Sequence, residues 1–69
     1  MYLDEEITIK DLEEALNAVI LHQRNQFDIH YDELRDMIIL YYIEKRQSMN
    51  TIEIRYKFMG TEHTYIHKL

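Results

Sequence analysis

Residues 37–43 read MIILYYI, a run of seven apolar or aromatic side chains in a chain of 69 residues. This run decides the fold because two different structures fit it. The flanking segments DELRD and EKRQ are good helix formers with no glycine or proline between them, so we predict one continuous helix from Tyr31 to Gln47. The alternative is a buried strand, since short apolar runs rich in Ile and Tyr also occupy sheet interiors.

As a helix, residues 31–47 would be apolar on two sides. Projected at about 100° per residue, one stripe faces the core and consists of Leu34, Met37, Ile38 and Tyr41. Ile39 and Ile43 fall nearly opposite, and Leu40 lies between the two stripes. A chain this short builds one modest core, which can hardly cover both sides. We therefore expect a partner surface on the second helix, made by Ile39, Leu40, Tyr42 and Ile43.

A first helix has a clear start at Thr8. This residue can act as the N-cap, with Asp11 at the third helical position approximating a capping box. From there apolar residues recur at three- and four-residue spacing and form one stripe: Ile9, Leu12, Leu16, Val19 and Ile20. The helix should end near Arg24 and Asn25. Residues 2–7 could add a short strand ahead of it.

The last third of the chain changes to a period of two. From Ile52 to Phe58, apolar residues alternate with charged ones, which is typical of a half-buried strand. A two-residue loop at Met59 and Gly60 predicts a hairpin and its register. The expected pairs are Tyr56 with His63, Ile54 with Tyr65, Ile52 with His67 and Lys57 with Glu62. Residues 1–69 should therefore form a single α+β domain, with two helices packed on a C-terminal antiparallel β-hairpin.

Composition argues against an enzyme. The chain has no Cys, which removes disulfides and thiolate metal sites, and its single Gly excludes a glycine-rich phosphate loop. His63 and His67 have the i, i+4 spacing that binds a metal on a helix. On the expected strand, four residues span about 13 Å, which is too far to share one ion. We expect no metal, no cofactor and no catalytic residues.

The formal net charge of −5 is unevenly distributed. Residues 1–36 hold ten acids and three bases, giving −7, whereas residues 37–69 hold three acids and five bases, giving +2. In the expected hairpin, Arg55, Lys57 and Lys68 share the face away from the core and could contact phosphates. Helices followed by a hairpin resemble the winged-helix order, so a DNA- or RNA-binding regulator is the alternative function. The acidic total and the few polar groups on the second helix count against it.

The expected location is the cytoplasm, of the source cell or of an infected host. The start MYLDEE is acidic, unlike a signal peptide, and no apolar span is long enough to cross a membrane. Many Ile, Tyr, Lys, Glu and Asn residues and no Pro suggest an A/T-rich genome, such as that of a low-GC bacterium, its phage or another mobile element. We predict a protein–protein interaction module, a regulator or inhibitor that forms a homodimer or docks on a larger protein through its second helix.

Overall fold

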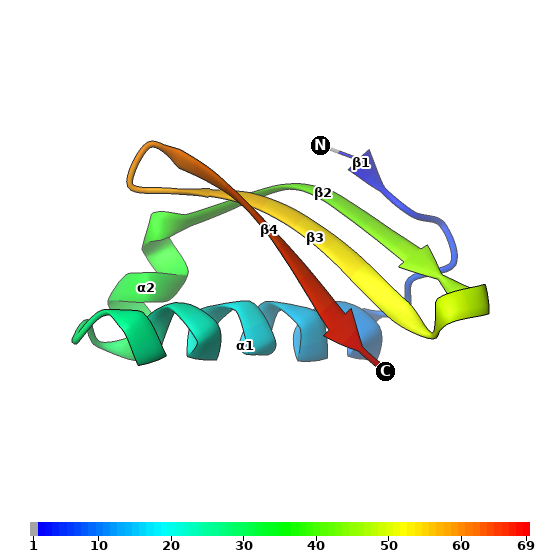
Figure 1. Cartoon of the computed structure of the whole chain (residues 1–69), viewed down its shortest axis with the longest axis horizontal. Helices are drawn as coiled ribbons and strands as arrows, with labels where there is room; N and C mark the ends of the chain where they lie inside the picture. The colour runs from blue at the N-terminus through cyan, green and yellow to red at the C-terminus, as the bar shows by residue number, and fades with distance from the viewer. Residues whose placement is uncertain (1) are drawn as a thin grey trace.

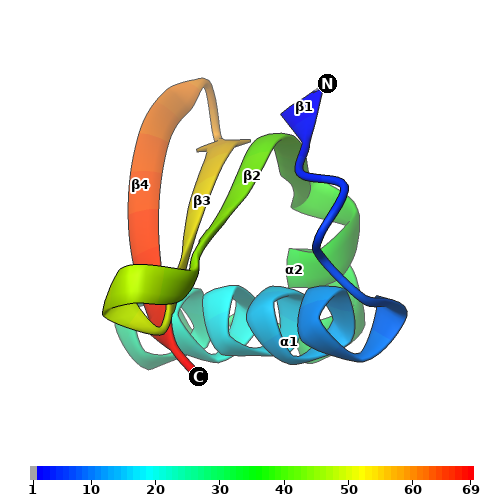
Figure 2. The ribbon, with the colours of Figure 1, turned by 90° about the vertical axis from the view of Figure 1, so that its right-hand side faces the viewer.

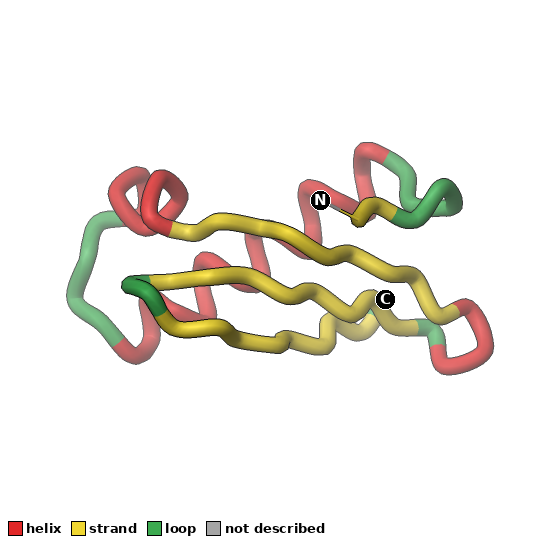
Figure 3. The backbone as a smooth tube through the Cα atoms, turned by 90° about the horizontal axis from the view of Figure 1, so that it is seen from above, coloured by secondary structure: helices red, strands yellow, loops and turns green. Residues whose placement is uncertain are grey.

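The computed structural model describes residues 2–69 and confirms the α+β fold. In chain order the elements are β1 (Tyr2–Leu3), α1 (Ile9–Gln26), α2 (Tyr31–Met37), β2 (Ile38–Arg46), the 3₁₀ turn η1 (Gln47–Met49), β3 (Thr51–Phe58) and β4 (Thr61–Lys68) (Figure 1). The strands form one sheet in the order β1-β2-β3-β4, with β1 parallel to β2 and the other neighbours antiparallel. α1 runs obliquely beneath one face of this sheet (Figure 3).

α1 begins with the expected capping box. The Asp11 N–H donates to Thr8 Oγ1 over 3.1 Å, and the Thr8 N–H donates to Asp11 Oδ2 over 3.4 Å. The helix continues to Gln26, slightly beyond the predicted end. Its inner stripe consists of Ala15, Val19, Ile20 and Gln23, all buried against the sheet. Ile9 was expected in this stripe but is 78% exposed, while Leu12 packs against the core.

The prediction of one helix from residue 31 to residue 47 is wrong. α2 is only seven residues long and ends at Met37, after which Ile38 begins β2. The strand alternative for this run is therefore correct. As a strand, the segment pairs with β3 and with β1, and Ile38 and Ile43 are buried. Ordinary residues differ by only about 0.7 kcal/mol each in helix propensity, which this pairing and burial outweigh.

A register shift in β2 explains why the apolar run lacks a period of two. The shift lies between Leu40 and Tyr42, so Tyr41 is an extra residue, as in a β-bulge. In a regular strand Leu40 and Ile43 would point to opposite faces. The extra residue turns both toward α1, where Ile43 is 1% exposed and Leu40 packs against the core.

The C-terminal hairpin forms in the predicted register. Met59 and Gly60 have positive φ angles of 53° and 78°, as the two central residues of a type I′ turn require. The cross-strand pairs include Tyr56 with His63, Ile54 with Tyr65, Ile52 with His67 and Lys57 with Glu62, all as expected. The alternate residues of β3 from Ile52 to Phe58 are buried and form the part of the core that faces α1.

The N-terminal segment joins the edge of β2 to the start of α1. β1 forms within the predicted range, and the Asp4 N–H that follows it donates to the Ile43 carbonyl over 3.0 Å. The Asp4 carboxylate accepts the Lys45 N–H over 3.1 Å. The Lys45 ammonium donates to Asp11 Oδ2 over 2.9 Å, and this hydrogen bond lowers the pKa of the Asp11 carboxyl. Because Asp11 also caps α1, one ion pair connects the helix start to the end of β2.

A buried polar pair connects α1 to β3. Gln23 and Tyr56 are 0% and 1% exposed, and Gln23 Nε2 donates to the Tyr56 hydroxyl oxygen over 2.5 Å. Burial raises the pKa of the Tyr56 phenol, so the phenol stays protonated at neutral pH. Gln23 Oε1 has no hydrogen-bond partner within the described residues. The pair therefore depends on one hydrogen bond between two groups that water does not reach.

Tyr56→Phe should lower the free energy of unfolding by about 1–3 kcal/mol, because it leaves the whole Gln23 amide buried without a partner. Combining it with Gln23→Met should recover most of that loss, since no unpaired polar group then remains at the site. Urea unfolding followed by circular dichroism measures both changes. A Tyr56→Phe variant as stable as the wild type would contradict this explanation, as would a double variant no more stable than Tyr56→Phe alone.

Candidate interaction surface

The candidate site is the face of the sheet turned away from α1, here called the outer face (Figure 2). Its side chains alternate along each strand with those that face the helix. They are Tyr2 of β1; Ile39, Tyr42, Glu44 and Arg46 of β2; Thr51, Glu53, Arg55 and Lys57 of β3; and Glu62, Thr64, Ile66 and Lys68 of β4. No helix within residues 2–69 lies over this face.

Five outer-face side chains of β2 and β3 form a closed ring of contacts. The Tyr42 hydroxyl donates to the Glu44 carboxylate, which forms an ion pair with Arg46 Nε at 3.2 Å. Glu53 accepts from both sides, with Arg46 Nη2 at 3.1 Å and Arg55 Nη2 at 2.7 Å. The Arg55 guanidinium carbon lies 4.3 Å from the centroid of the Tyr42 ring, which closes the ring through a cation–π contact.

This contact ring fixes the charge and position of its members. Glu53 is only 8% exposed although it lies on the outer face, because Arg46 and Arg55 lie against its carboxylate. The hydrogen bond to Glu53 raises the pKa of the Arg55 guanidinium. The hydrogen bond to Glu44 raises the pKa of the Tyr42 phenol. At neutral pH, Arg55 therefore stays charged and Tyr42 stays neutral.

Large apolar side chains lie around the contact ring. Tyr2, Ile39 and Ile66 are 50%, 62% and 51% exposed. The Tyr2 ring stacks on that of Tyr42, with centroids 5.0 Å apart. Ile39 lies opposite Lys57, toward the β3–β4 turn, whereas Ile66 is on β4 beside the contact ring. The outer face thus combines ordered charges with exposed apolar groups.

The four residues predicted to bind a partner do not form one surface. Ile39 and Tyr42 are on the outer face, but Leu40 packs against the core and Ile43 belongs to it. The prediction that Ile39 and Ile43 form one helical stripe is therefore wrong. The segment is a bulged strand, which places the two side chains on opposite faces of the sheet. Whether Ile39 and Tyr42 contact a partner stays a prediction.

The three basic residues of the alternative function share the outer face, as predicted for the hairpin. Lys57 and Lys68 are exposed, but Arg55 is paired with Glu53 and lies over Tyr42. The winged-helix order is wrong, because within residues 2–69 α2 leads straight into β2 and no recognition helix precedes the hairpin. Any contact with nucleic acid would use the sheet itself.

Two of the four histidines, His22 and His63, take part in aromatic packing on the helix side of the sheet. The His63 ring stacks on Tyr56 with centroids 5.2 Å apart, and His22 of α1 contacts Tyr65 with centroids 5.1 Å apart. Among residues 2–69, no three His, Cys, Asp or Glu side chains gather as a metal site would require. In the same range, no helix has both the length and the apolar character needed to cross a bilayer.

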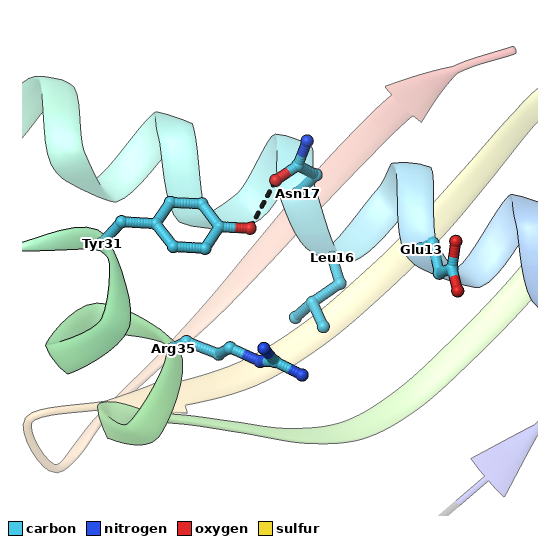
Figure 4. A pocket seen from close by; sticks show the side chains of 5 residues that line it. All are labelled: Glu13, Leu16, Asn17, Tyr31 and Arg35. Atoms are coloured by element: carbon cyan, nitrogen blue, oxygen red, sulfur yellow. Dashed lines mark hydrogen bonds between the residues drawn. The ribbon is translucent and has the colours of Figure 1, made fainter.

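A shallow hollow lies between α1 and α2 (Figure 4). It measures about 320 Å³ and is lined by Glu13, Leu16, Asn17, Tyr31 and Arg35. The Tyr31 hydroxyl donates to Asn17 Oδ1 over 2.5 Å and so joins the two helices. The Glu13 carboxylate and the Arg35 guanidinium are separate groups in the hollow (Figure 4). We assign no chemistry to this arrangement, which lacks a paired nucleophile and base.

Sequence reasoning missed Tyr2, Glu44, Arg46 and Glu53 as members of one surface. The two-residue spacing of Glu53 and Arg55 does predict that both lie on the same face of a strand. The expected helix put Arg46 at its C-terminal end, away from any strand partner. These side chains meet only when β2 is a strand antiparallel to β3, with Arg46 opposite the start of β3.

Comparisons of the chain with models of protein families, with curated proteins and with solved structures find no match. The function must therefore be inferred from the surfaces of the chain itself. On the outer face, ordered charges and exposed apolar groups occur together.

Proposed function

We propose that this chain is a small non-enzymatic protein–protein interaction module, a regulator or inhibitor that docks on a larger protein through its outer face. The observation that supports this proposal is the one-sided cover of the sheet. α1 buries one face, while the other presents Tyr2, Ile39 and Ile66, each half exposed or more. Full burial of one such side chain is worth about 1.5–3 kcal/mol, so a partner would gain by covering them.

The contact ring suits an interface because its side chains are already ordered. Arg and Tyr are enriched at the centres of protein interfaces. Immobilising a flexible side chain costs about 0.5–1.5 kcal/mol on binding. Arg55 is held by Glu53 and by the Tyr42 ring before any partner arrives, so this cost is reduced. The contact ring would thus form the rigid centre of the interface, with Ile39 as an apolar anchor nearer the β3–β4 turn.

The shape and charge of the outer face favour a folded protein as the occupant. Small-molecule sites are concave, whereas this surface is the open face of a sheet. Four bases and three acids give the outer face a formal charge of +1. Since the whole chain has a net charge of −5, the rest of the chain has a net charge of −6. A partner that docks here approaches the least acidic side. The phage or mobile-element origin and the cytoplasmic location expected from the sequence belong to the same proposal.

Ile39→Asp should weaken docking about tenfold or more, because it places a charge where an apolar contact is buried. Ile9→Asp is the matched control, since Ile9 is 78% exposed on α1, on the other side of the sheet. Cross-linking and quantitative mass spectrometry in the native host should recover a protein with the wild type and Ile9→Asp but not with Ile39→Asp. The recovered protein is then purified and titrated against all three chains.

Equal affinity of Ile39→Asp and the wild type for that purified protein would rule out the outer face as the docking site. Equal loss in both variants would also contradict the proposal, since Ile9 lies away from the face. Circular dichroism must show that both variants keep the wild-type fold.

Nucleic-acid binding is a second candidate, favoured by one observation. Lys57 and Lys68 are exposed on the same sheet face as the stacked rings of Tyr2 and Tyr42. Aromatic side chains on open sheets stack with unpaired bases, and nearby Lys and Arg residues contact the phosphates. A single-stranded RNA or DNA would therefore be the form bound.

A gel-shift assay with single-stranded oligonucleotides at two salt concentrations tests this second candidate. Binding should weaken as salt rises, and Lys57→Ala with Lys68→Ala should weaken it further, because phosphate contacts release counterions. Absence of binding at low salt, or binding unchanged in the double variant, would remove nucleic acid from consideration.

A further inference from the structure

The two margins of the sheet are protected to different extents. β1 pairs with Tyr42 and Ile43 of β2, and Asp4 binds the backbone of Ile43 and Lys45 just beyond it. β4 forms the opposite margin and pairs with β3 alone (Figure 2). It is eight residues long, with no Pro and no register shift. A long, regular edge of this kind is a template for a further strand.

The hairpin turn determines which backbone groups of β4 are free. In a two-residue turn the carbonyl before the loop accepts from the N–H after it, so Phe58 and Thr61 are a hydrogen-bonded pair. Such pairs alternate along an antiparallel ladder. The backbone groups of odd-numbered β4 residues therefore point toward β3, as does the Leu69 N–H, which donates to the Asn50 carbonyl over 3.0 Å. Those of Glu62, Thr64, Ile66 and Lys68 point outward.

The side chains of β4 are complementary to a second, antiparallel β4. We consider a two-fold axis that is perpendicular to the sheet and lies midway between the Tyr65 residues of the two copies. It would pair Glu62 with Lys68 of the second copy and Thr64 with Ile66 of the second copy. All four outward-pointing residues then lie in hydrogen-bonded pairs, and both copies keep their outer faces on the same side. Each seam contains two Glu–Lys pairs, because the symmetry repeats the contact.

Other registers use this edge less well. Moving the axis to Thr64 pairs Glu62 with Ile66 of the second copy and places Lys68 opposite the Gly60 turn. Moving it to Ile66 pairs Lys68 with Thr64 of the second copy and leaves Glu62 beyond the seam. Only the Tyr65-centred register combines opposite charges with full use of the free backbone groups.

We propose that two copies of this chain associate through their β4 edges in the Tyr65-centred register and form one continuous eight-stranded sheet. This dimer differs from the one expected from the sequence, which used a stripe on the second helix. It does not depend on docking at the outer face. It removes the free β4 edge of each copy and places two outer faces side by side.

Sedimentation equilibrium over a range of protein concentrations tests the dimer. The wild type should show a monomer–dimer equilibrium, and Thr64→Pro should remain monomeric, because the outward N–H it removes is not bonded to β3. Thr64→Ala keeps that N–H and should still dimerise. Ile39→Asp should dimerise as the wild type does, which separates this dimer from docking at the outer face. A wild type that stays monomeric at every concentration overturns the proposal.

Charge reversal tests the register and does not require Thr64→Pro to fold. Lys68→Glu places Glu62 opposite a like charge twice per seam and should raise the dimer dissociation constant about tenfold. Glu62→Lys should do the same through two Lys–Lys contacts. Mixing the two variants should restore dimerisation, since a mixed dimer contains only opposite pairs. Unchanged association of Lys68→Glu alone, or a mixture no tighter than its components, overturns the register.

Discussion

The packing of α1 on one face of the sheet is the constraint on which the rest of the structure depends. The helix is the main cover of the core, and its buried stripe of Ala15, Val19, Ile20 and Gln23 contacts the inner side of the strands. Because only one side is covered, each strand must alternate between apolar and polar faces. The outer face, with its contact ring and exposed Ile39, is a direct consequence of this arrangement.

The bulge at Tyr41 shows how an irregular sequence meets that constraint. A regular strand would place Leu40 and Ile43 on opposite faces and would expose one of them. One extra residue brings both to the core and turns Tyr42 outward, where it stacks on Tyr2 and supports Arg55. The same local distortion therefore completes the core and builds part of the proposed docking surface. Bulges commonly redirect a side chain in this way.

The sequence was sufficient to predict the structure where periodicity, turn residues and capping residues indicated the same element. The alternation from Ile52 to Phe58 and the turn at Gly60 predicted the hairpin register, and Thr8 predicted the start of α1. Residues 31–47 failed because the flanks favour a helix and the bulge removes the period of two. The pairing that decides the matter is with β3 and with β1, which lies about forty residues away in the chain.

The same contrast between local and long-range signals holds for the predicted surfaces. The basic face of the hairpin was found because it needs only the alternation of β3 and β4. The contact ring was not, since it requires Arg46 to face Glu53 and Tyr42 to face Arg55 across two strands. A turn signal was present at Asn50, which adopts a left-handed conformation with φ 53° after η1. Read as a second hairpin turn, it would have favoured a strand before it.

Residues 38–46 form a bulged strand between β1 and β3, with the core on one side and a free face on the other. Backbone NMR assignment of the native chain tests it most directly. We expect strand-type Cα shifts over residues 38–46, a cross-strand contact between Ile43 and Ile54, and a break in the register at Tyr41. Helical shifts continuing from Tyr31 through Arg46, without that contact, would contradict it.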